Sequence, residues 1–129
     1  MRCSSPPPTC AGGHGIRAGD DWLDASAATT PILAFGEAGD DTLKGGSSND
    51  VLNGGSGADT VVFTDAFGDD LVLGFQSADT LEFAVAGVTG IDDLEISEVD
   101  GNTRIEVEDH GSVTLVGFTG PLADNIVFA

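Results

Sequence analysis

An aspartate followed two residues later by an aliphatic side chain recurs along the central part of this chain. The clearest copies fill three consecutive nine-residue blocks, GEAGDDTLK at 36–44, GGSSNDVLN at 45–53 and GGSGADTVV at 54–62. Looser copies occur around Asp21, Asp70 and Asp79. A fixed period of nine residues indicates a repeat architecture, in which each unit is stabilised by stacking on its neighbours.

The positions of the nine-residue block have different physical roles. Glycine at positions one, two and four allows positive φ, so a tight turn can direct several carbonyl oxygens toward one point. The aspartate at position six adds a carboxylate there, and carbonyl and carboxylate oxygens together are the ligands that Ca²⁺ prefers. The aliphatic residue at position eight faces inward, because strand side chains alternate between faces. Leu43, Leu52 and Val61 are therefore predicted to stack in a narrow core.

These blocks resemble the nonapeptides of the RTX (repeats-in-toxin) family, the haemolysin-type calcium-binding repeats, whose consensus is G-G-x-G-x-D-x-U-x with U aliphatic. The resemblance implies an all-β fold, a right-handed parallel β-roll in which successive short strands alternate between two sheets. It also implies that Ca²⁺ lies between turns two repeats apart. The turn of Asp41 is then matched with that of Asp59, and the turn of Asp50 with that of Asp70.

The resemblance also assigns the metal ligands, which are the position-six aspartates and the carbonyl oxygens of the first four turn positions. The predicted metal-site residues are Asp41, Asp50, Asp59, Asp70, Gly36, Gly39, Gly45, Gly46, Ser47, Ser48, Gly54, Gly55, Ser56 and Gly57. The sequence departs from the consensus at Glu37 and Ser48, where a carbonyl ligand is retained only at some cost in backbone strain. Asp59 and Asp70 are 11 residues apart, two more than the period.

The charge of the chain limits its partners. It has 22 acidic and four basic residues, a formal net charge of −18 at pH 7, which disfavours nucleic acid and anionic membrane surfaces. The sequence contains no apolar run long enough to span a membrane. Repulsion between acidic side chains opposes a compact state. The free energy gained by burying one aliphatic side chain per repeat is also smaller than the conformational entropy cost of ordering nine residues. We therefore expect the repeats to be disordered without Ca²⁺ and to fold on binding it.

Two segments are expected before residue 82. Residues 1–15 are rich in Pro, Ser and Gly and are predicted to be a disordered leader. Its Cys3 and Cys10 are interpreted as a local disulfide or as free thiols, because a structural zinc site needs four ligands at closer spacing. Residues 16–81 are predicted to form the calcium-binding roll, with the best repeats at 36–62. The stretch 25–35 is interpreted as an insertion or a worn repeat.

Residues 82–129 are predicted to form a small antiparallel β-sheet that caps the roll. Apolar and polar residues alternate at 94–97 and 104–108, and turn signals occur at 100–102 and 109–111. The closing residues ADNIVFA resemble the C-terminal ends of RTX proteins, which a type I secretion apparatus reads. The N-terminus lacks the residue order of a cleaved signal peptide. We therefore expect a secreted, extracellular protein.

The predicted function is that of a calcium-binding module of a protein exported by type I secretion. No enzymatic activity is expected from this chain, because no catalytic constellation is present. The metalloprotease motif H-E-x-x-H needs two nearby histidines, and the chain has only His14 and His110. A serine-hydrolase nucleophile elbow is also absent. The alternatives are the C-terminal part of a larger secreted RTX enzyme, a metalloprotease or a lipase, and a calcium-stiffened adhesin or spacer.

Overall fold

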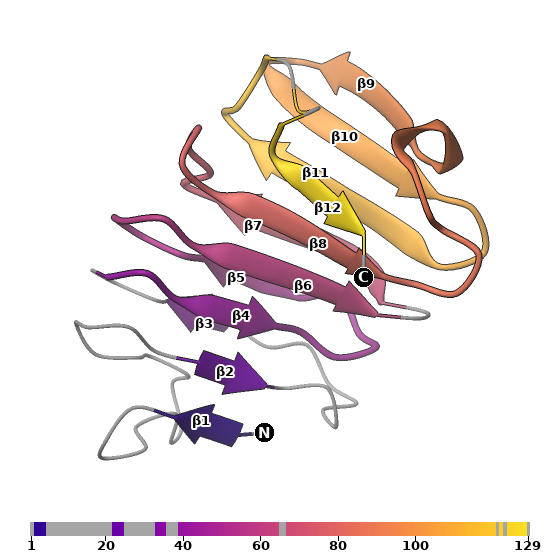
Figure 1. Cartoon of the computed structure of the whole chain (residues 1–129). Helices are drawn as coiled ribbons and strands as arrows, with labels where there is room; N and C mark the ends of the chain where they lie inside the picture. Colours follow the sequence, from indigo (N-terminus) through magenta and orange to yellow (C-terminus); the bar gives the residue numbers. More distant parts are fainter. Residues whose placement is uncertain are drawn as a thin grey trace.

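Two six-stranded β-sheets lie face to face around a narrow hydrophobic core (Figure 1). The computed structural model describes residues 2–4, 22–24, 33–35, 39–64, 67–120, 122 and 124–128. The strands are β1 (Arg2–Ser4), β2 (Trp22–Asp24), β3 (Leu33–Phe35), β4 (Thr42–Lys44), β5 (Val51–Asn53), β6 (Thr60–Thr64), β7 (Gly68–Leu73), β8 (Thr80–Ala84), β9 (Glu95–Val99), β10 (Asn102–Val107), β11 (Gly111–Val116) and β12 (Ile126–Phe128). Within these residues, the 3₁₀ turn η1 (Ile91–Asp93) is the only helical segment, and no helix has the length and hydrophobicity needed to cross a membrane.

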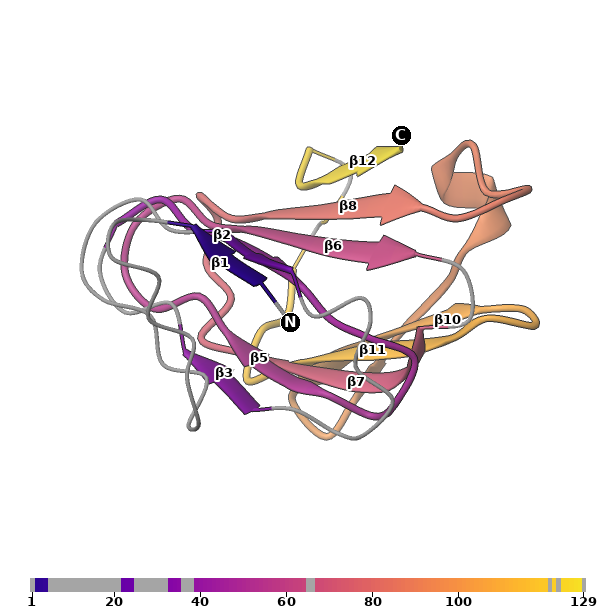
Figure 2. The same cartoon turned by 90° about the horizontal axis from the view of Figure 1, so that it is seen from below.

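Successive strands from β2 to β8 alternate between the two sheets, as the resemblance to RTX repeats implied. One sheet has the order β1-β2-β4-β6-β8-β12 and the other β3-β5-β7-β11-β10-β9. Each strand from β2 to β6 pairs in parallel with the strand two places further along the chain. Figure 2 shows β6, β8 and β12 in one layer and β5, β7 and β11 in the other. The predicted β-roll is therefore confirmed.

The core of the roll is one residue wide at its narrow end. Leu43, Leu52 and Val61 are at most 2% exposed, as predicted, and β4 and β5 each bury one side chain. The two residues beyond the nine-residue period are accommodated by a longer strand, because β6 has five residues. Its extra inward residue, Phe63, stacks on Phe83 with ring centroids 5.2 Å apart. The roll therefore widens from a single aliphatic column into an aromatic core.

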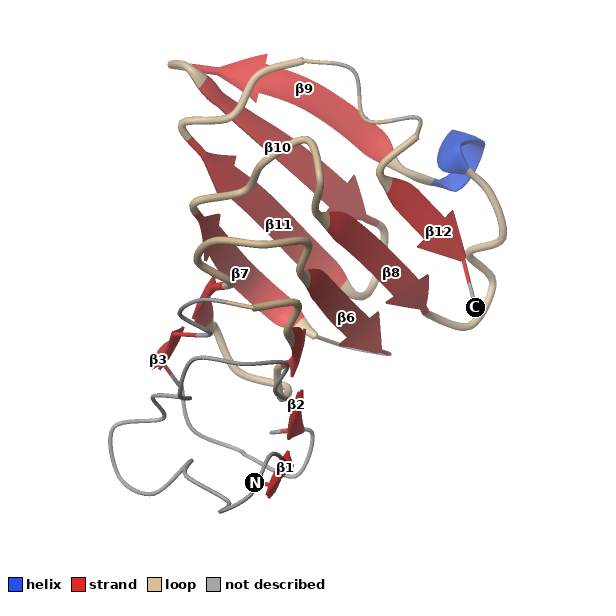
Figure 3. Cartoon of the chain, turned by 60° about the vertical axis from the view of Figure 1, so that its left-hand side comes forward, coloured by secondary structure: helices blue, strands red, loops and turns tan. Residues whose placement is uncertain are grey.

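The C-terminal strands extend both sheets of the roll (Figure 3). Strands β9, β10 and β11 are antiparallel, as predicted, and β11 pairs in parallel with β7. They therefore continue one sheet of the roll, whereas the sequence suggested a separate sheet packed on it. β12 continues the opposite sheet by parallel pairing with β8. This arrangement supplies hydrogen-bond partners to the edges of β7 and β8 that would otherwise be free.

The first strands differ in detail from the sequence prediction. Residues 2–4 form β1, which pairs antiparallel with β2, although a disordered leader was predicted for 1–15. The rest of that leader, including Cys10, lies outside the described residues. At the end of the stretch 25–35, β3 pairs in parallel with β5 and places the buried Ala34 beside Leu52. This pairing favours the interpretation of a worn repeat over that of an insertion.

The single column of buried side chains at the narrow end leads to a testable prediction about stability. Leu52→Ala should lower the free energy of unfolding by about 2–5 kcal/mol, because truncation of a fully buried side chain leaves a cavity. Urea denaturation of the folded protein measures this loss. Leu71→Ala is the control, since Leu71 is 41% exposed on the neighbouring strand β7, and its effect should stay within about 0.5 kcal/mol. Equal losses in both variants would contradict the narrow core.

Candidate metal centre

The position-six aspartates are buried, three of them directly before a strand and Asp70 within β7. Asp41, Asp50, Asp59 and Asp70 are at most 2% exposed. Their carboxylates link turns two repeats apart. The backbone N–H of Asp41 donates to Oδ1 of Asp59 at 2.9 Å, and that of Asp50 donates to Oδ1 of Asp70 at 2.8 Å. The structure therefore stacks the turns in the pairs that the resemblance implied.

Asp79 extends one of these stacks and was not in the predicted site. It is 4% exposed, and its Oδ1 accepts from the backbone N–H of Asp59 at 2.9 Å. The D-x-aliphatic pattern at Asp79 was the sequence signal for it. We refer to the stacked turns of Asp41, Asp59 and Asp79 as row A, and to those of Asp50 and Asp70 as row B.

The second carboxylate oxygen distinguishes two of these aspartates. Oδ2 of Asp59 and Oδ2 of Asp70 are buried and have no hydrogen-bond partner among the described residues. Oδ2 of Asp50, in contrast, accepts from the N–H of Gly46 at 2.9 Å. A buried carboxylate oxygen without a partner is costly, and a cation beside it removes that cost. These oxygens therefore fit a metal ion.

The glycine at position one gives the carboxylate room. A Cβ on Gly45 would lie 2.6 Å from Oδ2 of Asp50, and a Cβ on Gly54 would overlap the carboxylate of Asp59. Positive φ occurs at Gly39, Gly55 and Gly57, with values of 112°, 81° and 101°. The predicted positive φ is therefore found for position four at Gly39 and Gly57 and for position two at Gly55, but not for position one at Gly45 and Gly54. At position one, glycine is required because the aspartate takes the space that a Cβ would fill.

Carbonyl oxygens of one turn face the next turn of the same row. A Cβ on Gly57 would overlap the carbonyl oxygen of Gly39, one step away in row A. A Cβ on Gly68 would lie 2.9 Å from the carbonyl oxygen of Ser48 and 3.1 Å from that of Ser47 in row B. The space between the turns of Asp41 and Asp59 and the space between the turns of Asp50 and Asp70 are thus each bordered by backbone carbonyl oxygens and a buried carboxylate. Such oxygen donors suit a hard divalent cation.

The structure gives different outcomes for the predicted metal-site residues. Gly36 lies outside the described residues. The buried aspartates and the carbonyls of Gly39, Ser47 and Ser48 converge between stacked turns, as described above. The side chain of Ser56 is exposed, so that residue can take part only through its backbone. In the described part of the chain, no three His, Cys, Asp or Glu side chains form a metal cluster on their own, so any site here depends on carbonyl oxygens.

Burial changes the acidity of these aspartates. Loss of solvation is the main reason that the pKa of Asp70 is raised to about 8; the hydrogen bond from the backbone of Asp50 lowers this pKa, and the neighbouring charges of Asp50 and Asp69 add to the rise. Loss of solvation also raises the pKa of Asp59 to about 6, against hydrogen bonding from Asp41, which lowers it. The pKa of Asp79 is raised for the same first reason. At neutral pH without a cation, the folded state therefore favours a protonated carboxyl group at Asp70, whereas Asp59 becomes mainly protonated only below about pH 6.

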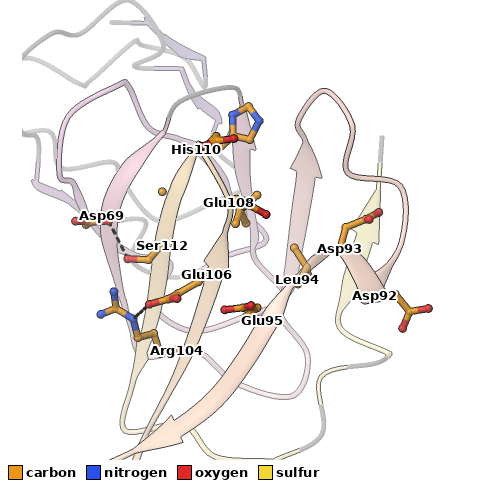
Figure 4. Close-up of a pocket in the computed structure, with 13 residues that line it drawn as sticks. Asp69, Asp92, Asp93, Leu94, Glu95, Arg104, Glu106, Glu108, His110 and Ser112 are labelled. Atoms are coloured by element: carbon orange, nitrogen blue, oxygen red, sulfur yellow. Dashed lines mark hydrogen bonds and ion pairs between the residues drawn. The ribbon is translucent and has the colours of Figure 1, made fainter.

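A separate cavity of about 710 Å³ opens beside β9, β10 and β11 (Figure 4). Its wall carries Asp69, Glu95, Glu106 and Glu108, and Arg104 forms an ion pair with Glu106 at 2.8 Å. Asp69 accepts a hydrogen bond from the hydroxyl of Ser112 at 3.0 Å. The acidic groups are spread over the wall, so the cavity does not offer the converging oxygens found in rows A and B.

Two sheets whose central strands are parallel, joined by stacked Gly/Asp turns, define a metal-binding β-roll. The family described as the RTX calcium-binding nonapeptide repeat (4 copies) matches residues 33–61, which confirms the predicted resemblance. Residues 33–61 are therefore similar to the RTX calcium-binding nonapeptide repeats. A comparison with curated proteins gives no significant match.

Among the solved structures similar to this chain are three from Serratia marcescens and Azotobacter vinelandii. The extracellular lipase LipA from Serratia marcescens is 28% identical with a TM-score of 0.57, over 92% of this chain and 20% of the lipase chain. The AlgE6R3 subunit of the mannuronan C5-epimerase from Azotobacter vinelandii is 27% identical with a TM-score of 0.55, over 94% of this chain and 82% of that subunit. The AlgE6R2 subunit of that epimerase is 29% identical with a TM-score of 0.58, over 86% and 89% of the two chains. This chain thus spans one fifth of the lipase and most of each epimerase subunit.

The role of the position-one glycine can be tested by adding a methyl group. Gly54→Ala should raise the calcium concentration for half-maximal folding by about tenfold or more, because the new Cβ overlaps the carboxylate of Asp59 and overpacking of this kind costs roughly 1–3 kcal/mol. Gly90→Ala is the matched control, since nothing lies within 4 Å of a Cβ there. Circular dichroism during calcium titration measures both. A shift no larger in Gly54→Ala than in Gly90→Ala would contradict the steric role.

The raised pKa values predict that acid favours the metal-free fold. Below the unfolded pKa of 3.8, the carboxyl of Asp70 is protonated in both states, and stability is lost as the pH rises through its folded pKa of about 8. Metal-depleted protein should therefore gain strand content as the pH falls from about 8 to about 5. Far-ultraviolet circular dichroism measures this change.

A neutral isostere separates this effect from the general fall in net charge. Metal-depleted Asp70→Asn should show more strand content than wild type near pH 8, whereas Asp92→Asn, the same charge change at an exposed position, should not. Equal behaviour of the two variants would show that net charge alone governs the acid response.

Proposed function

We propose that this chain is a calcium-binding module that is unstructured without Ca²⁺ and folds when Ca²⁺ binds between its stacked turns. The single observation that carries this proposal is the pair of buried Oδ2 atoms of Asp59 and Asp70, which have no hydrogen-bond partner in the described residues. Both aspartates belong to stacked turns, and carbonyl oxygens of Gly39 and Ser48 face the turns of Asp59 and Asp70. The match of residues 33–61 to calcium-binding repeats supports Ca²⁺ as the ion.

The stacked geometry indicates which residues would hold the ions. In row A, the turns of Asp41, Asp59 and Asp79 border two successive spaces. In row B, the turns of Asp50 and Asp70 border one. Carbonyl oxygens at position four, those of Gly39 and Ser48 among them, complete each ligand set. Ca²⁺ supplies the positive charge that allows these carboxylates to be buried in their ionised form.

Coupling between binding and folding follows from the charge of the rows. Neither Asp59 nor Asp70 forms an ion pair with a basic side chain among the described residues, where the Arg104–Glu106 pair lies on an exposed face. Ionised carboxylates therefore oppose the stacked state until a cation is bound. The free energy of binding then becomes free energy of folding. A dissociation constant of about 10⁻⁴–10⁻³ M, typical of extracellular calcium modules, places the transition outside the cell.

The cellular role is part of the same proposal. We place the module in a secreted protein that leaves the cell unfolded through a type I apparatus and folds outside. The printed name of LipA as an extracellular lipase and the RTX match support this placement. The chain itself is proposed to have no enzymatic activity. The calcium ion is its proposed ligand, and neither nucleic acid nor a membrane is a proposed partner.

A second candidate function is that of the C-terminal part of a larger secreted enzyme. It is favoured by one observation, namely that this chain aligns along 92% of its own length with only 20% of the lipase chain. In that case the module would support the folding of a catalytic domain carried elsewhere. Calcium binding by rows A and B is the same in both cases. No comparable observation favours an adhesin or a spacer.

Calcium titration of the full chain tests the proposal. Chelated protein should lack strand content, and Ca²⁺ should restore it reversibly, as followed by far-ultraviolet circular dichroism. Asp59→Asn should raise the half-maximal calcium concentration by at least about tenfold, because it removes a charged ligand from row A. Asp92→Asn, an exposed aspartate with the same charge change, should shift it by less than about twofold. Identical strand content with chelator and with saturating Ca²⁺ would refute the proposal.

A further inference from the structure

Row A ends where β12 joins the sheet beside β8. Ile126 of β12 lies beside Leu81, and the same register carried back along both chains brings Asp124 to the level of Asp79. Asp124 thus occupies the next position-six place of the row. Its side chain is exposed, however, unlike the buried aspartates of the preceding turns. The carboxylate column of row A therefore stops at Asp79.

The backbone hydrogen bonds also change at this point. The N–H groups of Asp41 and Asp59 each donate to the carboxylate of the next aspartate in row A. The N–H of Asp79 instead donates to the carbonyl oxygen of Gln76 within its own turn, at 2.9 Å. The series of hydrogen bonds from one turn of row A to the next therefore ends at Asp79.

The side chain of Asn125 covers the open side of this last turn. Its Nδ2 donates to the carbonyl oxygen of Ser77 at 2.8 Å and to that of Asp79 at 2.9 Å. Both partners are carbonyl oxygens, which only accept, so the amide nitrogen has to face them. Ser77 holds position four, counting from Gly74. In the turns of Gly39 and Ser48, the position-four carbonyl faces the next turn of its row, where we place the cation.

We propose that the amide group of Asn125 takes the place of a cation at the end of row A and so fixes where metal binding stops. The two N–H groups present partial positive charge to carbonyl oxygens that would otherwise be free to bind Ca²⁺. The amide needs no metal, so the contact between β12 and the roll forms without an ion. This inference rests on the proposed function, since it assumes that the preceding spaces of row A hold Ca²⁺.

Row B ends at Asp70, and an apolar residue follows it in the sheet. Val113 of β11 lies beside Asp70, where a further aspartate would continue the row. Val113 is fully buried and apolar. The neighbouring Ser112 donates its hydroxyl to Oδ1 of Asp69, and the N–H of Gly68 donates to the carbonyl oxygen of His110. The last turn of row B is thus covered by hydrogen bonds and an apolar side chain.

The inference is tested by counting bound calcium ions. Native mass spectrometry at saturating Ca²⁺ gives the number of ions per folded chain. Asn125→Asp should bind one ion more than wild type, because a carboxylate facing two carbonyl oxygens requires a bridging cation. Asn125→Ala should not gain an ion, since it adds no charge. Asn102→Asp is the matched control, because it makes the same change in a turn outside both rows, where the Oδ1 of Asn102 accepts from the N–H of Gly117.

The outcomes separate this inference from the proposed function. One additional ion in Asn125→Asp alone supports the inference. A folded Asn125→Asp with the wild-type number of ions overturns it and leaves the proposed function intact, and so does an equal gain in Asn102→Asp. A wild-type protein that binds no Ca²⁺ overturns both.

A measurement on the wild type covers the case in which Asn125→Asp does not fold. In calcium-loaded protein, the side-chain amide protons of Asn125 should exchange with solvent about tenfold more slowly than those of Asn102, because two hydrogen bonds hold them. Nuclear magnetic resonance of the side-chain amides gives both rates. Equal rates would overturn the inference, because a bound cation would turn the amide oxygen, and not the nitrogen, toward the site.

Discussion

The hydrogen bond from the backbone of one aspartate to the carboxylate of the next determines how this molecule is assembled. It joins turns that are 18 or 20 residues apart and thereby sets the register of the parallel strands that follow them. The same contact forces each carboxylate below the surface, where its charge is costly. The fold is therefore built on a group that opposes burial, and the roll needs a partner for that group.

The narrow and wide ends of the roll meet this need differently. At the narrow end, β4 and β5 bury one side chain each, so apolar contact contributes little. Toward the other end, Phe63, Phe67 and Phe83 pack together, with ring centroids 5.0 to 6.3 Å apart. Aromatic burial of this kind is a major source of stability that requires no ion. If the roll folds on calcium as proposed, its dependence on the metal is concentrated where the hydrophobic core is thinnest.

The periodic glycine, acid and aliphatic residues predicted a repeat architecture, and their resemblance to RTX repeats implied the roll, its two alternating sheets and the pairing of Asp41 with Asp59. The sequence could not show why position one is glycine, since the space below Gly54 is taken by a side chain five residues later. It also did not show that β11 and β12 continue the sheets of the roll. That pairing depends on strand edges left free by β7 and β8, which no local pattern records. Asp79 was visible in the pattern, but its place in row A follows only from the stacking.

Asp59 has a consequence of its own, because it borders two neighbouring spaces of row A. Its carboxylate meets the turn of Asp41 on one side, and its N–H meets Asp79 on the other. An ion that orders this residue from one side also orders the opposite side for a second ion. Neighbouring ions along the row would thus assist one another, and occupancy would rise steeply over a narrow range of concentration. A protein that folds on calcium in this way would respond to the difference between two environments as a switch, and only weakly to small fluctuations within either of them.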